Sequence, residues 1–238
     1  MSNFPFQRLQ IDLAALIART PAGHRLQSEP VLAKELGVSR ATLREAMRMF
    51  ETQGLIRRRQ GSGTFVVGKV RALDNGLEVL ESLETMAERL GLEVSVSDLY
   101  IEVVSANEEF ATALNVPVGK PLTLVRRVVR TDNRPVAFLV DILPEEILRA
   151  DDLSADFHGS VLDFLLERGY PLKTSRANVT AIGATAEVAK ALEIQRGDVL
   201  LHFHSQLFDQ SGKSVDYSLS YFIPGNFNFH IMRRIGPP

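Results

Sequence analysis

The feature that most constrains the fold of this chain is a change of hydrophobic period near residue 54. Before it, apolar residues recur at helical spacing, and after it the residues alternate as in a short β-hairpin. We expect helices over residues 6–18, 28–36 and 39–53, and strands over residues 55–59 and 64–67 around a turn at residues 60–63. Ser28 and Ser39 suit helix N-caps, Pro30 is tolerated in a first turn, and Gly54 suits the end of the third helix.

Three helices followed by a small hairpin are the plan of a winged helix-turn-helix, and the charges suit DNA. The third expected helix has an apolar face and a second face with three arginines spaced by four residues, Arg40, Arg44 and Arg48. Arginine can bind guanine through two hydrogen bonds or clamp a phosphate, and the start of such a helix reaches the base edges. We therefore expect Arg40 and Arg44 to read bases and Arg48, one turn deeper, to meet the DNA backbone.

The other expected DNA contacts come from small polar residues and from the hairpin. Ser39 lies at a helix N-terminus that suits a phosphate, and Thr42 would touch either a base methyl group or a phosphate. In the hairpin, arginines neutralise phosphates and glycines allow close approach to the duplex. The full expected set is Ser28, Ser39, Arg40, Thr42, Arg44, Arg48, Arg59, Gln60, Gly61, Gly63 and Thr64. The alternative is that the arginines form only a solvated face with surface ion pairs.

The distribution of charge indicates a chain with two different parts. Residues 1–68 hold ten Arg or Lys against five Asp or Glu, a net charge of +5, whereas all 238 residues together carry −2, so the remainder carries −7. A basic part joined to an acidic one indicates that only the first part meets a polyanion. There is no cysteine, no signal peptide and no apolar run long enough to span a membrane, so we expect a cytoplasmic location.

The rest of the chain predicts an α+β domain. Residues 68–76 are typical of a linker, and residues 77–90 have the amphipathic spacing of a helix. Strand-like runs follow near 98–105, 122–131, 135–142, 173–182, 198–209 and 214–223, and helix-like runs near 107–114, 160–168 and 185–193. Strands broken by isolated helices favour a mainly antiparallel sheet. We expect a winged helix-turn-helix domain at residues 1–67, a linker and connecting helix at 68–91, and a C-terminal α+β domain at 92–238.

Five stretches of the N-terminal part carry a specific set of motifs: Leu26–Glu29, Leu36–Arg40, Thr42–Ala46, Gly54–Ile56 and Arg59–Val66. They closely resemble the DNA-binding domain of GntR-family regulators, over nearly all of residues 6–67. The resemblance implies homodimers on short palindromic operators, with the tip of the hairpin in the minor groove. Pro30 departs from the family pattern, because it stands where the family usually has an arginine that contacts the DNA backbone. We therefore expect one phosphate contact to be missing.

A looser set of matches covers residues 92–235: Gly119–Leu122, Arg127, Asp132–Val136, Leu143–Pro144, Gly159–Asp163, Ala189–Ile194, Gly197–Asp198, Gly212–Ser218 and Tyr221–Phe222. They resemble the effector domain of the HutC-like branch of the family, called UTRA, which has a chorismate-lyase-like fold. The resemblance implies a ligand beside the sheet, held by Arg127, Ser160 and Asp216, and we add Phe222 to this expected effector site.

Each of these side chains suits a ligand, and each has a structural alternative. Arg127, between apolar neighbours on one strand face, could clamp a carboxylate or phosphate, and Ser160 opens a helix whose N-terminus favours an anion. Asp216 could accept a hydrogen bond from an amine or from sugar hydroxyls. The alternatives are an internal ion pair for Arg127, a capping box of Ser160 with Asp163, a sheet-edge ion pair for Asp216, and core packing for Phe222.

Three further observations bear on the ligand. Val129 stands where sugar-phosphate sensors of this branch carry a second arginine, which argues against a phosphosugar unless Arg126 or Arg130 takes part. His202 and His204 alternate onto one strand face, as metal ligands could. Because no third ligand is near in sequence, we expect no metal and no cofactor.

Together these features predict a homodimeric transcription regulator, a repressor, whose affinity for a palindromic operator in double-stranded DNA is controlled by a small-molecule effector with an anionic group. We expect no membrane partner. Two alternatives remain open: a lyase-like enzyme, because the C-terminal resemblance is to a lyase fold, and a ligand-independent architectural DNA binder. The sequence shows no nucleophile–base pair, so the prediction is that the chain is not an enzyme.

Overall fold

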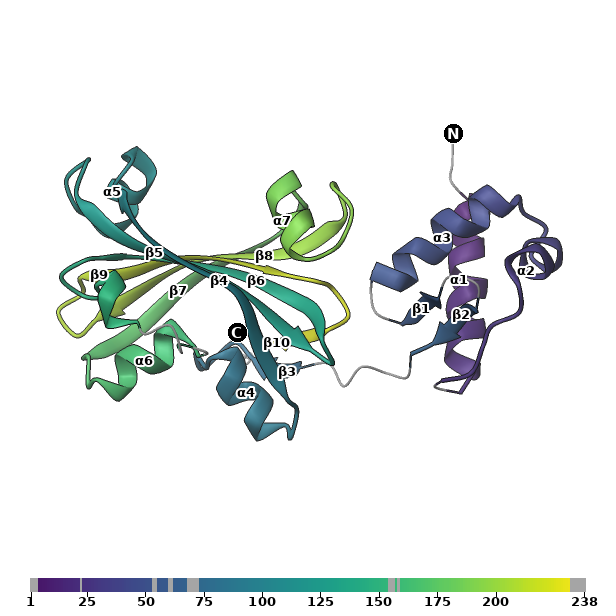
Figure 1. The fold of residues 1–238 in the computed structure, drawn as a ribbon, viewed down its shortest axis with the longest axis horizontal. Coiled ribbons are helices and arrows are strands. Elements are labelled where there is room, and N and C mark those ends of the chain that lie inside the picture. The colour runs from purple at the N-terminus through teal and green to yellow at the C-terminus, as the bar shows by residue number, and fades with distance from the viewer. Residues whose placement is uncertain are drawn as a thin grey trace, which may run out of the picture. The chain divides into compact units, whose positions relative to one another are not determined.

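The structure, a computed structural model, describes residues 4–21, 23–52, 55–59, 62–67, 73–153, 157 and 159–231. The chain divides into two compact units, Met1–Ala72 and Leu73–Pro238 (Figure 1). Each unit has its own buried apolar core.

Three helices and a hairpin make up the first unit, as the change of hydrophobic period predicts. The helices are α1 (Phe4–Arg19), α2 (Glu29–Glu35) and α3 (Arg40–Thr52), and the strands are β1 (Ile56–Arg59) and β2 (Gly63–Val66). β1 and β2 pair in antiparallel fashion, from Ile56 opposite Val66 to Arg59 opposite Gly63. All five elements contribute apolar side chains to one core: Leu9, Leu13, Ile17, Leu32, Leu43, Met47, Phe50, Ile56 and Val66.

A tight turn between α2 and α3 makes the helix-turn-helix. Gly37 has a φ of +66°, in the left-handed region that favours glycine, and the Val38 amide donates to the Ala33 carbonyl at 2.9 Å. Ser28 occupies the N-cap position of α2, but its side chain makes no capping hydrogen bond. The expected helix end at Gly54 lies outside the described residues.

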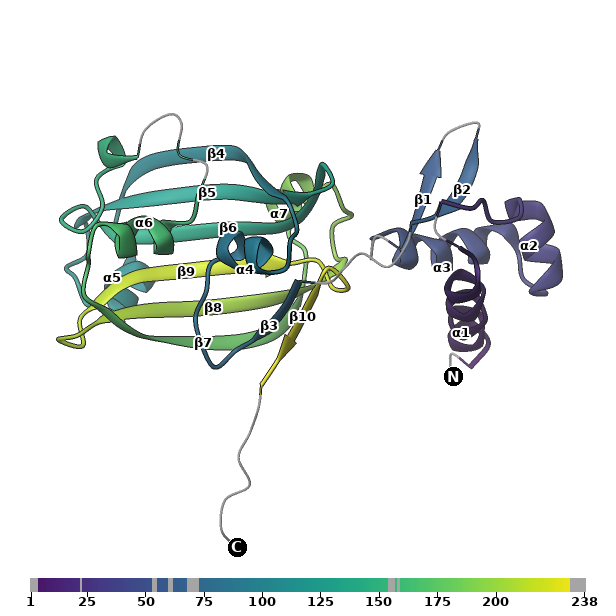
Figure 2. The same cartoon turned by 90° about the horizontal axis from the view of Figure 1, so that it is seen from below.

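A six-stranded antiparallel sheet forms the second unit, in the order β4-β5-β6-β9-β8-β7 (Figure 2). The strands are β4 (Val94–Ser105), β5 (Pro121–Thr131), β6 (Arg134–Pro144), β7 (Leu172–Gly183), β8 (Val199–Asp209) and β9 (Ser214–Phe222). β5 and β6 are buried at most positions, because helices cover both faces of the sheet. The α+β class with a mainly antiparallel sheet is therefore confirmed.

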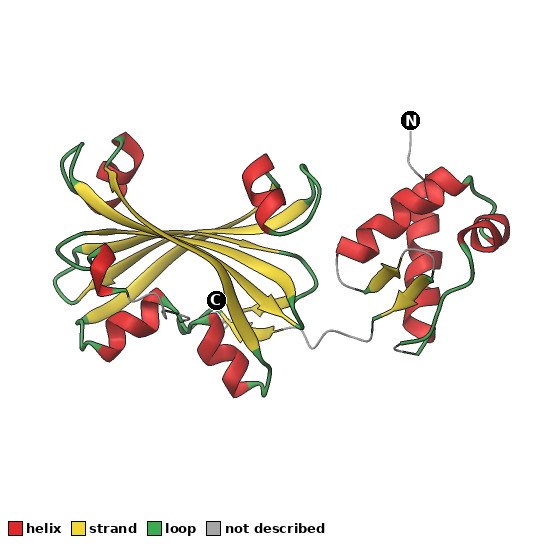
Figure 3. Cartoon of the chain, viewed as in Figure 1, coloured by secondary structure: helices red, strands yellow, loops and turns green. Residues whose placement is uncertain are grey.

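Two pairs of helices cover the sheet, one pair on each face (Figures 1 and 3). They are α4 (Leu83–Arg89), α5 (Glu108–Leu114), α6 (Val161–Glu167) and α7 (Ala186–Ala191), with a 3₁₀ turn at Ala150–Asp152. We call the two sides the α4/α6 face and the α5/α7 face. Since side chains alternate along a strand, Val125, Arg127 and Val129 of β5 point to the α4/α6 face, and Arg126 points to the α5/α7 face.

The structure departs from two expectations for residues 68–90. The segment expected as a linker contains β3 (Leu73–Gly76), which pairs in parallel with β10 (Phe227–His230); residues 68–72 lie outside the described part. The expected helix begins only at Leu83, after Ser82, whose hydroxyl accepts from the Thr85 amide at 2.9 Å. Local periodicity could reveal neither feature, because β3 depends on a partner far along the chain and the helix start depends on its cap.

Candidate functional site

The first candidate site is the arginine face of α3. Arg40 and Arg44 are exposed one turn apart, so both guanidinium groups are accessible. At the start of the helix, Ser39 Oγ accepts from the Thr42 amide at 3.1 Å and lies 2.8 Å from Thr42 Oγ1. These two hydroxyls fix the first turn of α3. Arg48 is half-buried and pairs with the carboxylate of Glu45 at 3.0 Å.

Two glutamates that the sequence analysis did not select tie the arginines to the fold. Glu29, in the first turn of α2, lies 3.2 Å from Arg44 Nε and 4.0 Å from Arg58 Nε. Arg58 also lies 3.5 Å from the Glu51 carboxylate and donates to the Arg44 carbonyl at 3.1 Å. The ion pairs join α2, α3 and β1 around Arg44, which holds that side chain near one position before any ligand arrives.

The hairpin presents its predicted residues unequally. Arg59 is exposed, and its guanidinium carbon lies 5.3 Å from the centre of the Phe65 ring. Thr64 is only 6% exposed, so its side chain packs inward, which does not favour a direct side-chain contact with DNA. Gln60 and Gly61 lie outside the described residues, and their roles stay predictions.

Arg25 is a further residue beside the hairpin that the sequence analysis missed. Its backbone bridges to Phe65, and its guanidinium group lies over Gly63. Gly63 has a φ of +109°, and a Cβ there would collide with the Arg25 guanidinium, whose Cζ would be 2.9 Å away. The φ of +109° favours glycine at this position, whereas the guanidinium of the exposed Arg25 could move aside. Arg25 belongs to no periodic pattern, so only the folded contact identifies it.

The second candidate site is a buried polar cluster on the α4/α6 face. Arg127 of β5, 4% exposed, forms an ion pair with Asp141 of the neighbouring strand β6. Asp216 of β9 is 6% exposed, and its Oδ1 has no hydrogen-bond partner among the described residues. Asp216 and Glu84 of α4 both interact electrostatically with Arg127. The buried Arg127 thus interacts with carboxyl groups from three elements, β6, β9 and α4.

Burial changes the acidity of two of these carboxylates. It raises the pKa of Asp216 well above the usual range, and the charge of Asp141 raises it further, while Arg127 opposes the change. Burial also raises the pKa of Glu84, again against the opposing effect of Arg127. Within the described structure, neither carboxylate oxygen of Glu84 has a hydrogen-bond partner. Burial thus disfavours the charged form of both carboxyl groups, and a donor or a cation that reaches them would favour it.

The N-terminal ends of α4 and α6 are joined beside this cluster. Ser160, 4% exposed, caps α6 by accepting from the Asp163 amide at 3.3 Å. The Asp163 carboxylate accepts from the Ser82 hydroxyl at 2.5 Å and from the Thr85 hydroxyl at 3.4 Å. A cleft of about 350 Å³ lies between the two helices, lined by Glu84, Thr85, Glu88, Asp163, Leu166 and Glu167. A larger cleft, about 470 Å³, lies near the β8–β9 turn, but its lining holds one charged side chain, Lys213.

The structure thus brings three of the four predicted effector residues to one region. Arg127 has the internal ion pair that was one alternative, and Ser160 has a capping role. The sheet-edge alternative for Asp216 is wrong, because β9 lies inside the sheet between β6 and β8. Phe222 lies 5.1 Å from Phe203 between ring centres in a buried aromatic group, which favours core packing. Asp141, Glu84 and Ser82 were not predicted, because only the fold brings them to Arg127 and Asp163.

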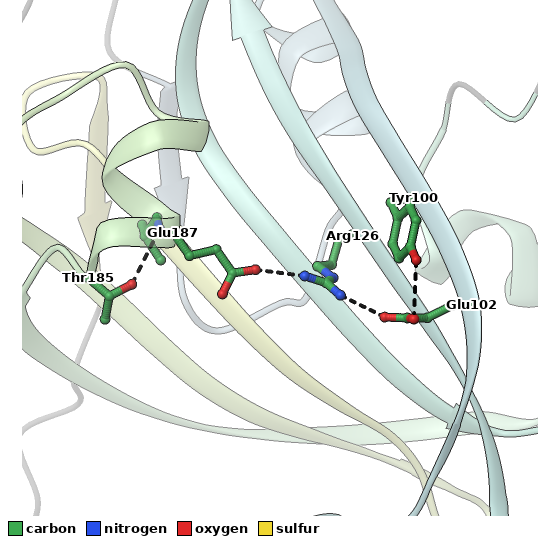
Figure 4. A network of polar contacts seen from close by, with 6 residues as sticks. Tyr100, Glu102, Arg126, Thr185 and Glu187 are labelled. Carbon is green, nitrogen blue, oxygen red and sulfur yellow. Dashed lines mark hydrogen bonds and ion pairs between the residues drawn. The ribbon is translucent and has the colours of Figure 1, made fainter.

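The other arginines of β5 do not join this cluster. Arg126 points to the α5/α7 face, where it contacts Glu187 at 2.7 Å and Glu102 at 2.6 Å, with the Tyr100 hydroxyl 3.3 Å from the same Glu102 carboxylate (Figure 4). Arg130 contacts Glu193 at 2.8 Å. Neither arginine therefore takes the place of the second arginine that sugar-phosphate sensors carry at the position of Val129.

His202 and His204 also lie on the α5/α7 face. Each stacks with or packs edge-on against a tyrosine, with ring centres 4.7 Å apart for His202 and Tyr221 and 4.8 Å apart for His204 and Tyr217. Burial, and then the neighbouring His204, lower the pKa of His202. Across the described residues, no group of three or more His, Cys, Asp or Glu side chains could hold a metal ion. None of the described helices is long and apolar enough to cross a membrane.

Two family models match the chain. The model for bacterial regulatory proteins of the gntR family matches residues 6–66, and the UTRA domain model matches residues 89–228. Among solved structures, PhnF from Mycobacterium smegmatis is similar in fold, with a TM-score of 0.66 and 21% identity over 96% of this chain and 100% of that one.

Several curated relatives are transcription regulators. An uncharacterised HTH-type transcriptional regulator of Rhizobium meliloti is 31% identical over 82% of this chain and 80% of its own. The histidine utilization repressor of Pseudomonas putida is 30% identical over 76% of this chain and 72% of its own. The repressor NagR of Bacillus subtilis is 26% identical over 88% of this chain and 86% of its own. The chain is therefore a transcriptional regulator and not an enzyme, and it belongs to the GntR family, in the HutC-like branch that carries a UTRA domain.

Proposed function

We propose that this chain is a homodimeric, cytoplasmic repressor that binds a palindromic operator and responds to a small molecule. The observation that carries the proposal is the separation of two sites in one chain. An exposed arginine face lies on α3, and a buried cluster with unsatisfied carboxylates lies around Arg127. Relatives named as repressors, among them the histidine utilization repressor, support the sign of regulation.

In the first unit, Arg40 and Arg44 read bases in the major groove, and Arg48 contacts the DNA backbone. Glu29 holds Arg44 in place beforehand. Ser28 and Ser39 contact phosphates through helix N-termini, and Thr42 meets a base methyl group or a phosphate. The hairpin adds Arg59 with Gln60, Gly61, Gly63 and the backbone of Thr64, and Arg25 beside them. Two copies are needed, because symmetric half-sites are read by symmetric heads.

The regulatory mechanism is a two-state coupling between the units Met1–Ala72 and Leu73–Pro238, through the stretch of chain that joins them. A ligand that binds one arrangement of the second domain more tightly changes the spacing of the two DNA-binding heads. A coupling free energy of about 1–3 kcal/mol would change operator affinity about 5- to 150-fold, enough for a useful switch.

The test is a selection of genomic DNA fragments with purified wild-type protein, Arg44→Ala and the matched control Arg19→Ala. Arg19 is an exposed arginine at the end of α1. Wild type and Arg19→Ala should enrich one short palindrome, and Arg44→Ala should lose about 1–3 kcal/mol of operator binding free energy. Failure of the wild type to enrich any sequence, or an equal loss in the control, would contradict the proposal.

A further inference from the structure

The charges around Arg127 define what kind of molecule the effector site can accept. Arg127 is the one cation of the cluster, and its Nη1 already donates to Asp141. Asp216 and Glu84 are the other acidic groups that act on it. Asp163, at the start of α6, acts electrostatically on Glu84. Among the described residues, the cluster therefore has more acidic groups than its single cation can pair with.

The unsatisfied atoms show the same excess of acceptors. Asp216 Oδ1 and both carboxylate oxygens of Glu84 are buried without a hydrogen-bond partner among the described residues. On the donor side, Arg127 Nε is also buried without a partner. Buried polar atoms are normally paired, so these three acceptors and one donor indicate which groups a ligand bound here would supply. Such a ligand brings several donors and one acceptor.

The cleft next to the cluster is also rich in acidic side chains. Four of its six lining residues are acidic and none is basic: Glu84, Glu88, Asp163 and Glu167, with Thr85 and Leu166. Its volume of about 350 Å³ falls in the range of small-molecule sites. Glu84 lines the cleft and also acts electrostatically on Arg127, so the acidic cleft and the buried cluster share this residue, although Arg127 and Asp216 do not line the cleft.

This arrangement disfavours the binding of an anion. A phosphate or carboxylate would have to compete with Asp141 for Arg127 and would approach Asp216 and Glu84 at the same time. Val129 offers no second cation, and Arg126 is paired with acids on the opposite face. These features do not support the anionic effector that the sequence suggested.

We propose that the effector is a small organic cation whose protonated nitrogen is bound by Asp216 and Glu84 and whose hydrogen-bond acceptor meets Arg127 Nε. This inference rests on the proposed function, in which the second unit binds an effector, and it adds the chemical class of that effector. It also assigns Glu84, on α4, as a ligand-contacting residue. Glu84 lies on α4, a helix that is capped by Ser82 and joined to α6 by the hydrogen bond from Ser82 to Asp163, so a ligand at Glu84 would act on both helices.

Proton release should accompany binding. Burial raises the pKa of Asp216 and of Glu84, and a bound cation would lower both, so binding should displace protons from these two groups. Affinity should therefore increase as pH rises, as long as the ligand nitrogen stays protonated. The ionisable groups that face the site from all packed elements are Arg127 of β5, Asp141 of β6, Asp216 of β9, Glu84 and Glu88 of α4, and Asp163 and Glu167 of α6.

The experiment measures the thermal unfolding midpoint of the full chain with matched amines and acids at millimolar concentration. The pairs are putrescine and succinate, tyramine and hydroxyphenylacetate, and glucosamine and gluconate, with inorganic phosphate as a further anion. We expect at least one amine to raise the midpoint while its acid does not. Asp216→Asn and Glu84→Gln should each weaken that amine about tenfold or more. The control Glu108→Gln, exposed on α5 at the other face, should not.

Two results overturn the inference. In the first, succinate, gluconate or phosphate raises the midpoint and Arg127→Gln abolishes the effect. In the second, none of the amines raises it. A measurement of operator affinity with the same compounds distinguishes failure of this inference from failure of the proposed function. If an acid changes operator affinity, the repressor proposal stands and the cationic class is wrong, whereas no response to either series in both assays contradicts both. Glu84→Gln keeps the test decisive if Asp216→Asn does not fold.

Discussion

At the scale of single residues, this protein places polar groups where the surrounding fold leaves them incompletely paired. Asp216 is buried in the interior of a sheet, and Glu84 buries its carboxylate beneath a short helix. Buried charges without partners are expensive and are therefore uncommon in purely structural positions. In the first unit, Gly63 is under a different constraint, a backbone φ of +109° that disfavours residues with a Cβ. Both settings give predictions that single substitutions can test.

The first residue-scale prediction concerns pH. Asp216 and Glu84 have folded-state pKa values raised by burial, so the folded state binds protons more tightly than the unfolded state does. Their contribution to the free energy of unfolding should fall as pH rises above the usual carboxyl range of about 4. Asp216→Asn should flatten this slope in denaturant titrations of the full chain between about pH 5 and pH 8. An unchanged slope in Asp216→Asn and in Glu84→Gln would show that neither acid has a raised pKa.

The second residue-scale prediction concerns Gly63. Gly63→Ala should destabilise the first unit by about 1–3 kcal/mol, chiefly because a φ of +109° disfavours alanine and in smaller part because the Arg25 guanidinium must move away from the new Cβ. Gly37→Ala is the matched control, since Gly37 has a φ of +66° with open space around its Cβ position. Chemical denaturation of both variants measures the difference. Adding Arg25→Ala should restore part of the loss in Gly63→Ala only, and an equal loss in both glycine variants would argue against the collision.

At the scale of elements, the short helices of this protein position charged and capping side chains against neighbouring elements, and they are not stable structures by themselves. α2 brings Glu29 to Arg44, and α4 brings Ser82 and Glu84 to α6 and the sheet. Each of these helices has seven residues, which is too short for stability in isolation, so packing against α3 or the sheet holds it. What such a helix presents therefore depends on the register in which it packs.

The element-scale prediction concerns the first turn of α2. Pro30 is exposed there, at the position where the family resemblance implies an arginine that contacts the DNA backbone. Pro30→Arg should tighten operator binding several-fold and steepen the dependence on salt by about one counterion. Pro30→Ala is the control for loss of the proline ring alone. Fluorescence anisotropy at several salt concentrations gives both values, and equal affinities for the two variants would show that the position does not reach a phosphate.

At the scale of the whole molecule, the chain has two units with separate cores and separate chemistry. The first unit carries the net positive charge of residues 1–68, and the second carries the acidic excess. A polyanion is attracted to the first and repelled by the second, which favours one orientation of the protein on DNA.

The whole-molecule prediction is that the two units unfold in separate thermal transitions. Scanning calorimetry of the full chain should show two transitions, and operator DNA should raise the one that Gly63→Ala lowers. Asp216→Asn should change only the other transition. A single transition that shifts as one in both variants would show that the units fold as one cooperative body.

The sequence by itself determined most of the elements, because hydrophobic period, caps and turn residues are local properties. The helices and hairpin of the first unit, and the six strands of the sheet, follow from such patterns, as does the exposed face with Arg40 and Arg44. Tertiary structure alone decided which distant groups meet. The pairing of β3 with β10, the ion pair of Glu29 with Arg44, and the meeting of Glu84 with Arg127 join segments that share no local pattern. Electrostatics and burial depend on distances in space, which periodicity along the chain does not encode.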